Sequence, residues 1–438
     1  MTFARAALAA LLLTLLSAVP AAARDVAIHV GRLIDGTGAA PREKVTILIK
    51  DDRIVAVHDG FESPAGADVI DLSQRTVLPG LIDTHVHITM NLHGGDPIRN
   101  AVTRDEYMAM ADGVADARLT LLAGFTAVRS LSDPTSAVIA LKRSIAEGTI
   151  PGPRLWVAGT ALGPTGGHGD PANGLLPDIA ELPHWNDSLV DSPEQGRLAV
   201  RRLWRAGVDV IKIMPSGGVV SIGDNPNLQL MTDDEIGAVV QTAHALGLKV
   251  AAHAHGKQAI DHALALGVDS IEHGTYADEA SYRLFKQHGA YLVPTLLVAE
   301  RIYEVAKTHP ERLNPSTAQK AIEVVPVLLA NFGKAHAAGV KIAFGTDTFG
   351  ISPHGRNAEE FALLVRAGLT PMEAILTATR NAADLLGDSA DVGSIQPGRY
   401  ADIIAVDADP LRDIRALEKV DFVMKGGQVV KENGAPKL

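Results

Sequence analysis

Residues 78–87 read Leu-Pro-Gly-Leu-Ile-Asp-Thr-His-Val-His, an apolar stretch that ends in two histidines separated by one residue. The pattern predicts a buried β-strand with His85 and His87 at its end. Side chains on a strand alternate between its two faces, so both imidazoles point the same way. Such a pair suits a divalent metal ion, although it also fits two strand-end residues that hydrogen-bond to neighbouring backbone. The rest of the chain decides between these interpretations.

The composition indicates a globular protein with an acidic surface. The 438 residues are 47% hydrophobic, which is ample for a large core, and the net charge is −11. This charge argues against nucleic acid or an anionic membrane as the main partner. The chain contains no cysteine, so it has no disulfide, no thiol nucleophile and no thiolate metal site. Any metal ion is therefore held by histidine, carboxylate or a modified side chain.

Residues 1–23 have the layout of a secretory signal peptide. Arg5 precedes the apolar residues 6–19, and Ala21-Ala22-Ala23 offers small residues at the cleavage positions. The apolar run is shorter than the roughly 20 residues that a membrane anchor needs. We therefore expect a mature chain that starts near Arg24 and has no stable membrane anchor after signal cleavage. We expect it to be secreted or, if the source is a Gram-negative bacterium, periplasmic.

A regular alternation of helix and strand follows residue 81. Helical stretches repeatedly end in glycine before a short apolar strand, as at Ala206-Gly207-Val208 and Leu246-Gly247-Leu248. The expected strands are residues 81–87, 126–130, 154–159, 208–214, 249–253, 270–273, 291–295 and 341–347. Eight such strands favour an α/β fold of the (β/α)₈ TIM-barrel type over residues 80–386. A doubly wound open sheet is the alternative, but His85-Val86-His87 stands where its Gly-rich phosphate turn is expected.

Both ends of the mature chain are rich in β-strand signals. Residues 45–50 and 53–57 flank Asp51-Asp52 as a hairpin, and residues 422–424 and 428–430 flank a second turn. Neither end offers enough strands for a core of its own. We therefore expect residues 24–79 and 387–438 to pack together as one small β-sandwich beside the barrel.

Polar residues recur where the expected barrel strands end, which is where barrel enzymes carry their chemistry. They are His85, His87, Lys212, His253, His255, His273 and Asp347. Lys212 shares the inward face of its strand, where a bare ammonium is costly unless an Asp or Glu pairs with it. Alternatively, the neutral amine has reacted with CO₂ to form an anionic carbamate that could bridge two metal ions. Asp347 could equally cap the next helix or pair with this lysine.

These residues resemble the amidohydrolase superfamily over nearly the whole mature chain. The motifs of the superfamily are residues 77–87, Lys212, the later histidines, Gly345-Thr346-Asp347 and the turn-rich residues 393–402. A narrower likeness is to the subgroup of Xaa-Pro dipeptidases, related carboxypeptidases and ochratoxin-degrading amidases. It is carried by Thr165-Gly166-Gly167-His168-Gly169, by residues 212–219 and by His253-Ala254-His255-Gly256.

The resemblance implies a binuclear centre of divalent ions, with zinc expected. One ion would be held by His85, His87 and Asp347. The other would be held by His253 and His273, and a carbamate on Lys212 derived from CO₂ would bridge the pair. Two ions supply hydroxide near neutral pH, which would attack an amide carbonyl. Asp347 would then pass a proton to the leaving nitrogen.

Two further histidines are similar in position to substrate-contacting histidines of the superfamily. His255 and His168 could each hold a substrate carboxylate or stabilise the oxyanion, or could simply order a loop. The expected reaction is cleavage of an amide bond to a C-terminal amino acid, in a dipeptide, short peptide or N-acyl amino acid, ochratoxin A included. The alternatives are a cyclic-amide hydrolase of the imidazolonepropionase type and a non-catalytic binding protein. We also expect a homo-oligomer.

Overall fold

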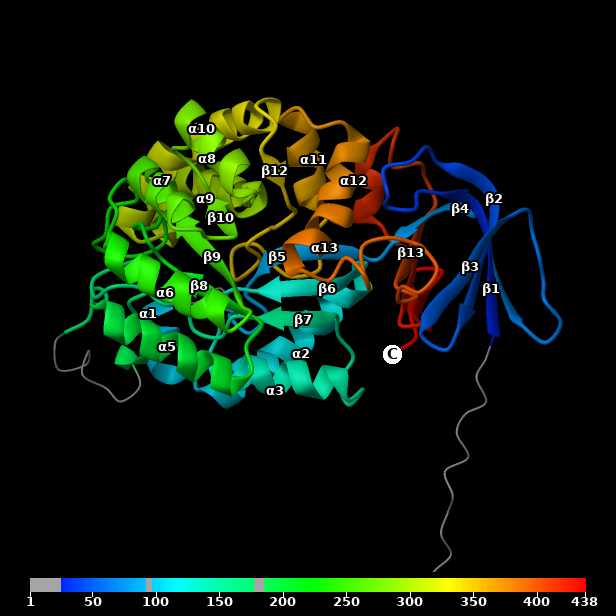
Figure 1. Ribbon diagram of the computed structural model, residues 1–438, viewed down its shortest axis with the longest axis horizontal. Helices are drawn as coiled ribbons and strands as arrows, with labels where there is room; N and C mark the ends of the chain where they lie inside the picture. Colours follow the sequence, from blue (N-terminus) through cyan, green and yellow to red (C-terminus); the bar gives the residue numbers. More distant parts are fainter. Residues whose placement is uncertain (1–24, 92–96, 177–184) are drawn as a thin grey trace, which may run out of the picture.

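The computed structural model describes residues 25–91, 97–176 and 185–438. The predicted signal peptide lies outside this range. Figure 1 shows two parts side by side: a sheet built from both ends of the chain, and a larger body in which helices surround parallel strands. In the described part of the chain, no helix is long and apolar enough to cross a membrane.

Strands from both ends of the chain form one mixed sheet. Its order is β16-β15-β14-β13-β4-β1-β2-β3. The strands are β1 (Asp25–Leu33), β2 (Arg42–Lys50), β3 (Arg53–Asp59), β4 (Asp68–Pro79), β13 (Ile403–Val406), β14 (Phe422–Lys425), β15 (Gln428–Glu432) and β16 (Ala435–Pro436). The two ends join where β13 runs antiparallel to β4, with Ile404 opposite Leu78. A single continuous sheet therefore stands where we expected a sandwich of two.

The larger body holds the eight strands expected from the sequence, all parallel to their neighbours. They are β5 (Leu81–Val86), β6 (Phe125–Ser130), β7 (Arg154–Val157), β8 (Val210–Ile213), β9 (Lys249–Ala254), β10 (Ser270–His273), β11 (Tyr291–Val293) and β12 (Lys341–Ile342). They pair in chain order as two sheets, β5-β6-β7 and β8 to β12. The expected closed ring is not continuous. Single parallel bridges, Leu162 to Ile213 and Val86 to Thr348, link the edges of the two sheets.

The missing continuity has a local cause. β12 has only two residues, and the chain that follows it leaves strand geometry to place Asp347 at a φ of 55°. Beyond β7 the chain likewise turns into the long loop that carries His168. Hydrogen-bonded strand pairing is therefore lost after β12, where the chain leads to Asp347, and after β7, where it leads to His168.

Helices follow the parallel strands and cover them. They are α1 (Pro97–Thr103), α2 (Glu106–Leu122), α3 (Thr135–Ala146), α5 (Pro193–Ala206), α6 (Asp233–Ala245), α7 (Lys257–Ala265), α8 (Glu279–His288), α9 (Leu296–Thr308), α10 (Pro315–Ala337), α11 (Glu359–Arg366), α12 (Pro371–Thr377) and α13 (Arg380–Leu386), with short 3₁₀ turns η1 (Trp185–Ser188), η2 (Pro310–Arg312) and η3 (Ile414–Glu418). Gly207 closes α5 at φ 99° and Gly289 closes α8 at φ 68°. Both adopt the left-handed conformation that their place in the sequence predicts.

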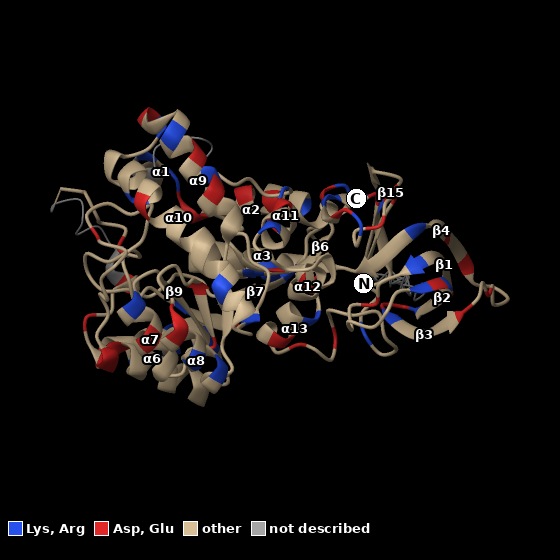
Figure 2. Ribbon diagram, turned by 90° about the horizontal axis from the view of Figure 1, so that it is seen from above, with Lys and Arg blue, Asp and Glu red and all other residues tan. Residues whose placement is uncertain are grey.

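Buried apolar residues gather into two main clusters. One large cluster of buried aliphatic and aromatic residues fills the body, and a second fills the terminal sheet. Figure 2 shows acidic and basic residues interspersed along the ribbon of both parts. Charge alone therefore does not locate a functional site in this view, which leaves the polar residues at the strand ends as the candidates.

Candidate metal centre

The structure brings the residues predicted from the strand ends into two compact groups. His85, His87 and Asp347 form one group, and His253, His255 and His273 form the other. Within each group, one potential ligand atom per residue lies within 4.8 Å of the others. The groups are neighbours, because the ring centroids of His85 and His273 are 5.4 Å apart. Side chains that lie far apart in the sequence thus meet at the carboxyl ends of the parallel strands.

The first group has two imidazole nitrogens directed at one carboxylate oxygen. Asp347 Oδ1 lies 2.8 Å from His87 Nε2 and 3.5 Å from His85 Nε2, yet it accepts no well-aligned hydrogen bond. The other nitrogens are engaged elsewhere: His85 Nδ1 donates to Glu272 Oε2 at 2.8 Å and His87 Nδ1 to the Ser132 carbonyl at 3.0 Å. Because these partners only accept, Nε2 keeps its lone pair in the neutral form of each ring, although burial is outweighed by Asp347, which raises the pKa of His87. Two nitrogens and an oxygen are therefore available to a metal ion.

Asp347 is held in place by its backbone. Its φ of 55° is uncommon for a residue other than glycine, and its N–H donates to the His85 carbonyl at 2.7 Å. Burial alone would raise the pKa of the Asp347 carboxyl, but His85 and His87 overcome this effect and hold the pKa well below its usual range. The side chain is thus an ionised carboxylate.

The second group consists of three buried rings. His253 Nε2 donates to the Gly217 carbonyl at 3.3 Å, which leaves Nδ1 as its free nitrogen. His255 and His273 use Nδ1 in hydrogen bonds to threonine hydroxyls, at 2.7 and 2.6 Å. Burial lowers the pKa of all three imidazoles, so the rings are neutral near pH 7. Neutral imidazole is the form that binds metal ions.

Lys212 lies on β8 with 1% of its surface exposed. Its Nζ has no hydrogen-bond or ion-pair partner among the described residues. Burial lowers the pKa of Lys212 to about 8, although Glu272 and Asp347 raise it through space. The salt-bridged lysine that the sequence left open is therefore not what the structure contains. A buried amine without a partner fits a side chain that is completed by a further group.

The sequence interpretation missed Glu272 and Arg129. Glu272 on β10 is fully buried and accepts from both His85 Nδ1 and Arg129 Nη2, the latter at 3.0 Å. Burial opposes ionisation of Glu272, but Arg129 and His85 outweigh it and lower the pKa to about 2. This carboxylate fixes the orientation of His85. The available signal was a glutamate inside the apolar strand Ser270-Ile271-Glu272-His273.

Asp83 was also missed, although it belongs to the decisive stretch. It is fully buried and accepts from the Thr346 hydroxyl at 2.6 Å and from Asn357 Nδ2 at 2.8 Å. Its Oδ1 accepts from the backbone N–H of His85 at 3.1 Å. Asp83 thereby ties the strand that carries His85 to the loop that carries Asp347.

His168 lies beside the two groups and belongs to neither. Its ring stacks on His253 with centroids 4.2 Å apart, and Nδ1 lies 2.8 Å from Ser221 Oγ. Burial lowers the pKa of His168 to about 4. The structure therefore places both His168 and His255 against candidate ligands.

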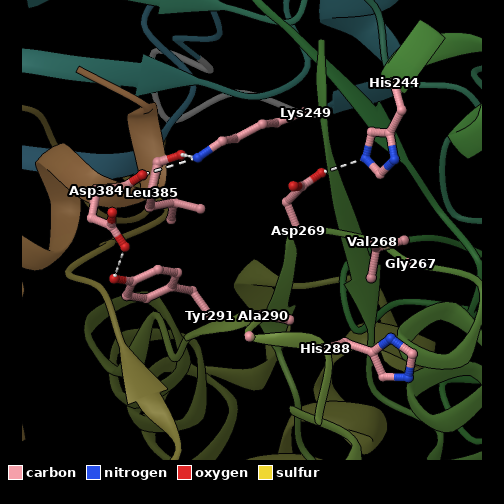
Figure 3. A pocket seen from close by; sticks show the side chains of 11 residues that line it. His244, Lys249, Gly267, Val268, Asp269, His288, Ala290, Tyr291, Asp384 and Leu385 are labelled. Atoms are coloured by element: carbon pink, nitrogen blue, oxygen red, sulfur yellow. Dashed lines mark hydrogen bonds and ion pairs between the residues drawn. The ribbon is translucent and has the colours of Figure 1, made fainter. Parts of the chain in front are cut away.

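A hollow of about 260 Å³ lies at the opposite, amino-terminal ends of β9, β10 and β11 (Figure 3). Several of its polar groups already have partners: His244 pairs with Asp269 at 2.9 Å, and Lys249 donates to the carbonyls of Asp384 and Leu385. This volume is below that of typical ligand pockets. None of the candidate metal ligands lines it, so we assign the chemistry to the carboxyl ends.

Comparison with known proteins gives a consistent result. Residues 76–430 match the family model described as "Amidohydrolase family". Ochratoxinase of Aspergillus niger is 34% identical over 439 aligned residues, which cover 94% of this chain and 88% of that protein. Its crystal structure superposes with a TM-score of 0.82 at 30% identity, covering 95% of this chain and 98% of the other.

Two further relatives bear on the reaction. A Xaa-Pro dipeptidase crystallised with methionine in its active site has a TM-score of 0.88 and 37% identity, covering 93% of this chain and all of that one. The imidazolonepropionase of Sphingopyxis alaskensis is more distant, at 26% identity over 83% of this chain and 87% of its own. The nearer resemblances are thus to hydrolases of amide bonds.

Proposed function

Since the chain belongs to the amidohydrolase family and is a hydrolase that acts on amide bonds, we propose that it is a metal-dependent enzyme that releases a C-terminal amino acid. Its substrate would be a dipeptide, a short peptide or an N-acyl amino acid, with ochratoxin A among the candidates. The observation that carries this proposal is the pair of adjacent ligand groups beside an unpartnered buried lysine. The names of the ochratoxinase and dipeptidase relatives support the substrate class.

The donor set fits two divalent ions. We expect zinc, because the ligands are imidazole nitrogens and carboxylate or carbamate oxygens. His85, His87 and Asp347 would hold one ion through Nε2, Nε2 and a carboxylate oxygen. His253 and His273 would hold the other, with His255 close enough to contribute. Reaction of neutral Lys212 with CO₂ would form an N–C bond and release one proton, giving a carbamate between the groups. The orphaned Lys212 Nζ and Asp347 Oδ1 support this assignment.

Two such ions, when bound, lower the pKa of a shared water enough to supply hydroxide near neutral pH. The residues of the chain then have separate tasks. Asp347 is ionised and ready to accept a proton, which it would return to the leaving nitrogen. Glu272 holds His85 with its proton on Nδ1, so that Nε2 remains a ligand.

We extend the proposal to the architecture around the site. The two bridges between the parallel sheets support a (β/α)₈ barrel over residues 80–386, flanked by residues 24–79 and 387–438 as one β unit. Export through residues 1–23 and assembly as a homo-oligomer stay predictions. Size-exclusion chromatography of the mature protein and N-terminal sequencing of exported material test them.

A cyclic-amide hydrolase of the imidazolonepropionase type is the second candidate. The similarity to an imidazolonepropionase, at 26% identity over 83% of this chain, favours it. The buried, unpartnered Lys212 weighs against it, because we expect that reaction to need no bridging carbamate. A non-catalytic binding protein on the same fold ranks third, since such a protein needs no intact ligand set.

The deciding experiment is hydrolysis of a small panel: Xaa-Pro, Xaa-Phe and Xaa-Arg dipeptides, N-acyl amino acids, ochratoxin A and imidazolonepropionate. Each substrate is assayed before chelation, after chelation and after zinc is restored. Zinc-restored cleavage of a linear amide supports the proposal. Opening of imidazolonepropionate alone would move the second candidate to first place, and an inert protein without bound metal would favour the third.

A further inference from the structure

His168 is connected to a chain of polar groups that leads away from the metal ligands. Its Nδ1 lies 2.8 Å from Ser221 Oγ, and Ser221 Oγ lies 2.6 and 2.7 Å from the two carboxylate oxygens of Asp224. Asp224 has a fully buried side chain and also accepts from the Gly218 N–H at 3.0 Å. These contacts determine where the proton of His168 resides.

The Ser221 hydroxyl has one proton to donate, and its neighbours are the Asp224 carboxylate, the Gly218 carbonyl at 3.3 Å and the His168 ring. A carboxylate only accepts, and a hydroxyl oxygen 2.6 Å from it without an intervening proton would be repelled. Ser221 therefore donates to Asp224 and accepts from His168. It follows that Nδ1 of His168 carries the proton and that Nε2 of the neutral ring is an acceptor.

Lys320 on α10 fixes this arrangement from outside the site. It is 8% exposed, and its Nζ donates to the carbonyls of Gly218 and Ser221, each at 2.6 Å, and to Asp224 Oδ1 at 2.9 Å. One ammonium thus neutralises Asp224 and ties the loop that carries Ser221.

The same loop packs directly on His168. A Cβ built on Gly218 would lie 2.1 Å from Nδ1 of the ring, so only glycine allows this approach. The loop that carries Gly218 and Ser221 therefore packs closely against the imidazole of His168. Hydrogen bonds from the Lys320 ammonium hold the loop in this position.

We propose that Lys320, Asp224 and Ser221 are positioning residues that hold His168 in the Nδ1–H form and present its Nε2 as a hydrogen-bond acceptor beside the metal centre. The identity of the group that His168 meets rests on the proposed function. From the sequence, His168 could hold a substrate carboxylate, stabilise the oxyanion or order a loop, and the first two roles need a donor. An acceptor instead pairs with a substrate N–H or O–H.

The direct test is the tautomer of His168, read from long-range ¹H–¹⁵N correlations in zinc-loaded protein. Wild type is expected to show the Nδ1–H form. Ser221→Ala removes the acceptor, so the ring should move toward Nε2–H, which free neutral histidine prefers. Ser221→Thr restores a hydroxyl and should restore the wild-type signal. An Nε2–H ring in wild type, or no change in Ser221→Ala, would overturn the proposal.

Lys320→Met tests whether Lys320 is needed for the hydrogen-bond chain from Asp224 through Ser221 to His168. Lys334→Met is the matched control. Lys334 is on the same helix, and the one side-chain hydrogen bond of its Nζ to a described residue is to Asn331 Oδ1, at 3.1 Å. Lys320→Met should shift the tautomer signal and Lys334→Met should leave it unchanged. The same His168 tautomer signal in both variants would show that Lys320 does not position His168.

A kinetic measurement links the tautomer to the reaction. We expect kcat/KM to fall about 10–100-fold in Ser221→Ala at unchanged zinc content, and to recover in Ser221→Thr. Normal kcat/KM with a shifted tautomer would show that His168 does not act as an acceptor. The His168 tautomer can be observed without turnover. A protein that cleaves no amide but shows the Nδ1–H form of His168 would therefore refute the proposed function and still support the positioning role of Ser221, Asp224 and Lys320.

Discussion

Replacement of Glu272 by glutamine probes the candidate metal centre most sharply, because this carboxylate has three buried partners: His85, Arg129 and the Ser270 hydroxyl. One oxygen lies 2.8 Å from His85 Nδ1 and the other 3.0 Å from Arg129 Nη2. A glutamine amide has one acceptor atom and one donor group. Whichever way the amide turns, it presents its NH₂ to His85 or to Arg129.

The size of each effect follows from these contacts. An NH₂ facing His85 forces Nδ1 to accept and moves the ring proton to Nε2, the nitrogen that lies toward Asp347. Loss of such an orienting partner lowers metal affinity about 10–100-fold. Arg129 is only 2% exposed and loses its charge partner, which costs about 3–5 kcal/mol for a broken buried pair. One retained hydrogen bond places the expected loss near the lower end, about 3 kcal/mol.

Two measurements on Glu272→Gln separate these effects. Urea unfolding of metal-free protein gives the free energy of unfolding, and zinc titration against a competing chelator gives the affinity. The double variant Glu272→Gln/Arg129→Met removes the unpaired charge, so its stability should recover while its zinc affinity stays low. A glutamine that keeps its oxygen toward His85 turns its NH₂ to Arg129 and still loses stability. Wild-type zinc affinity together with wild-type stability in Glu272→Gln would therefore refute the inference that this carboxylate holds both partners.

Three other variants test single groups. Lys212→Ala should lose most activity and regain part of it with added short carboxylates, measured by amide hydrolysis; full activity without additives would exclude the carbamate. Asp347→Asn should bind less zinc and turn over slowly even when loaded, and near-normal kcat would identify a different base. Burial raises the pKa of Glu360 from 4.5 to about 8, while its oxygens accept from the N–H groups of Leu296 and Leu297. Because the folded state holds this proton more tightly, the contribution of Glu360 to stability is greatest below pH 4.5 and falls up to pH 8, by at most about 1.4 kcal/mol per pH unit. The difference in unfolding free energy between wild type and Glu360→Gln should therefore change with pH over this range in urea unfolding, and parallel pH curves would contradict the assignment.

The strand ends were predictable because two one-dimensional rules apply to them. Alternation places His85 and His87 on one face, and the barrel rule assigns chemistry to the carboxyl ends of strands. The two ligand groups assemble from positions read in this way. The terminal sheet was less predictable, because strand signals show which segments pair and do not show whether one sheet or two will result. Continuous pairing around the barrel was not predictable either, because the sequence does not show that β12 ends after two residues and that Asp347 then adopts a φ of 55°.

Supporting residues escaped the sequence because their meaning exists only in three dimensions. Glu272 is separated from His85 by 187 positions, and Lys320 from Gly218 by 102. Within its own segment each has an ordinary explanation, a strand glutamate and a helix lysine. The sequence identifies the residues that can bind a metal ion. Their distant hydrogen-bond partners determine which ring nitrogen carries the proton and which has a free lone pair. Substitution of a supporting residue should therefore change which nitrogen of a histidine is protonated, while the histidine itself stays in the site. For this reason zinc affinity and tautomer, rather than activity alone, are the observables that distinguish a supporting residue from a ligand.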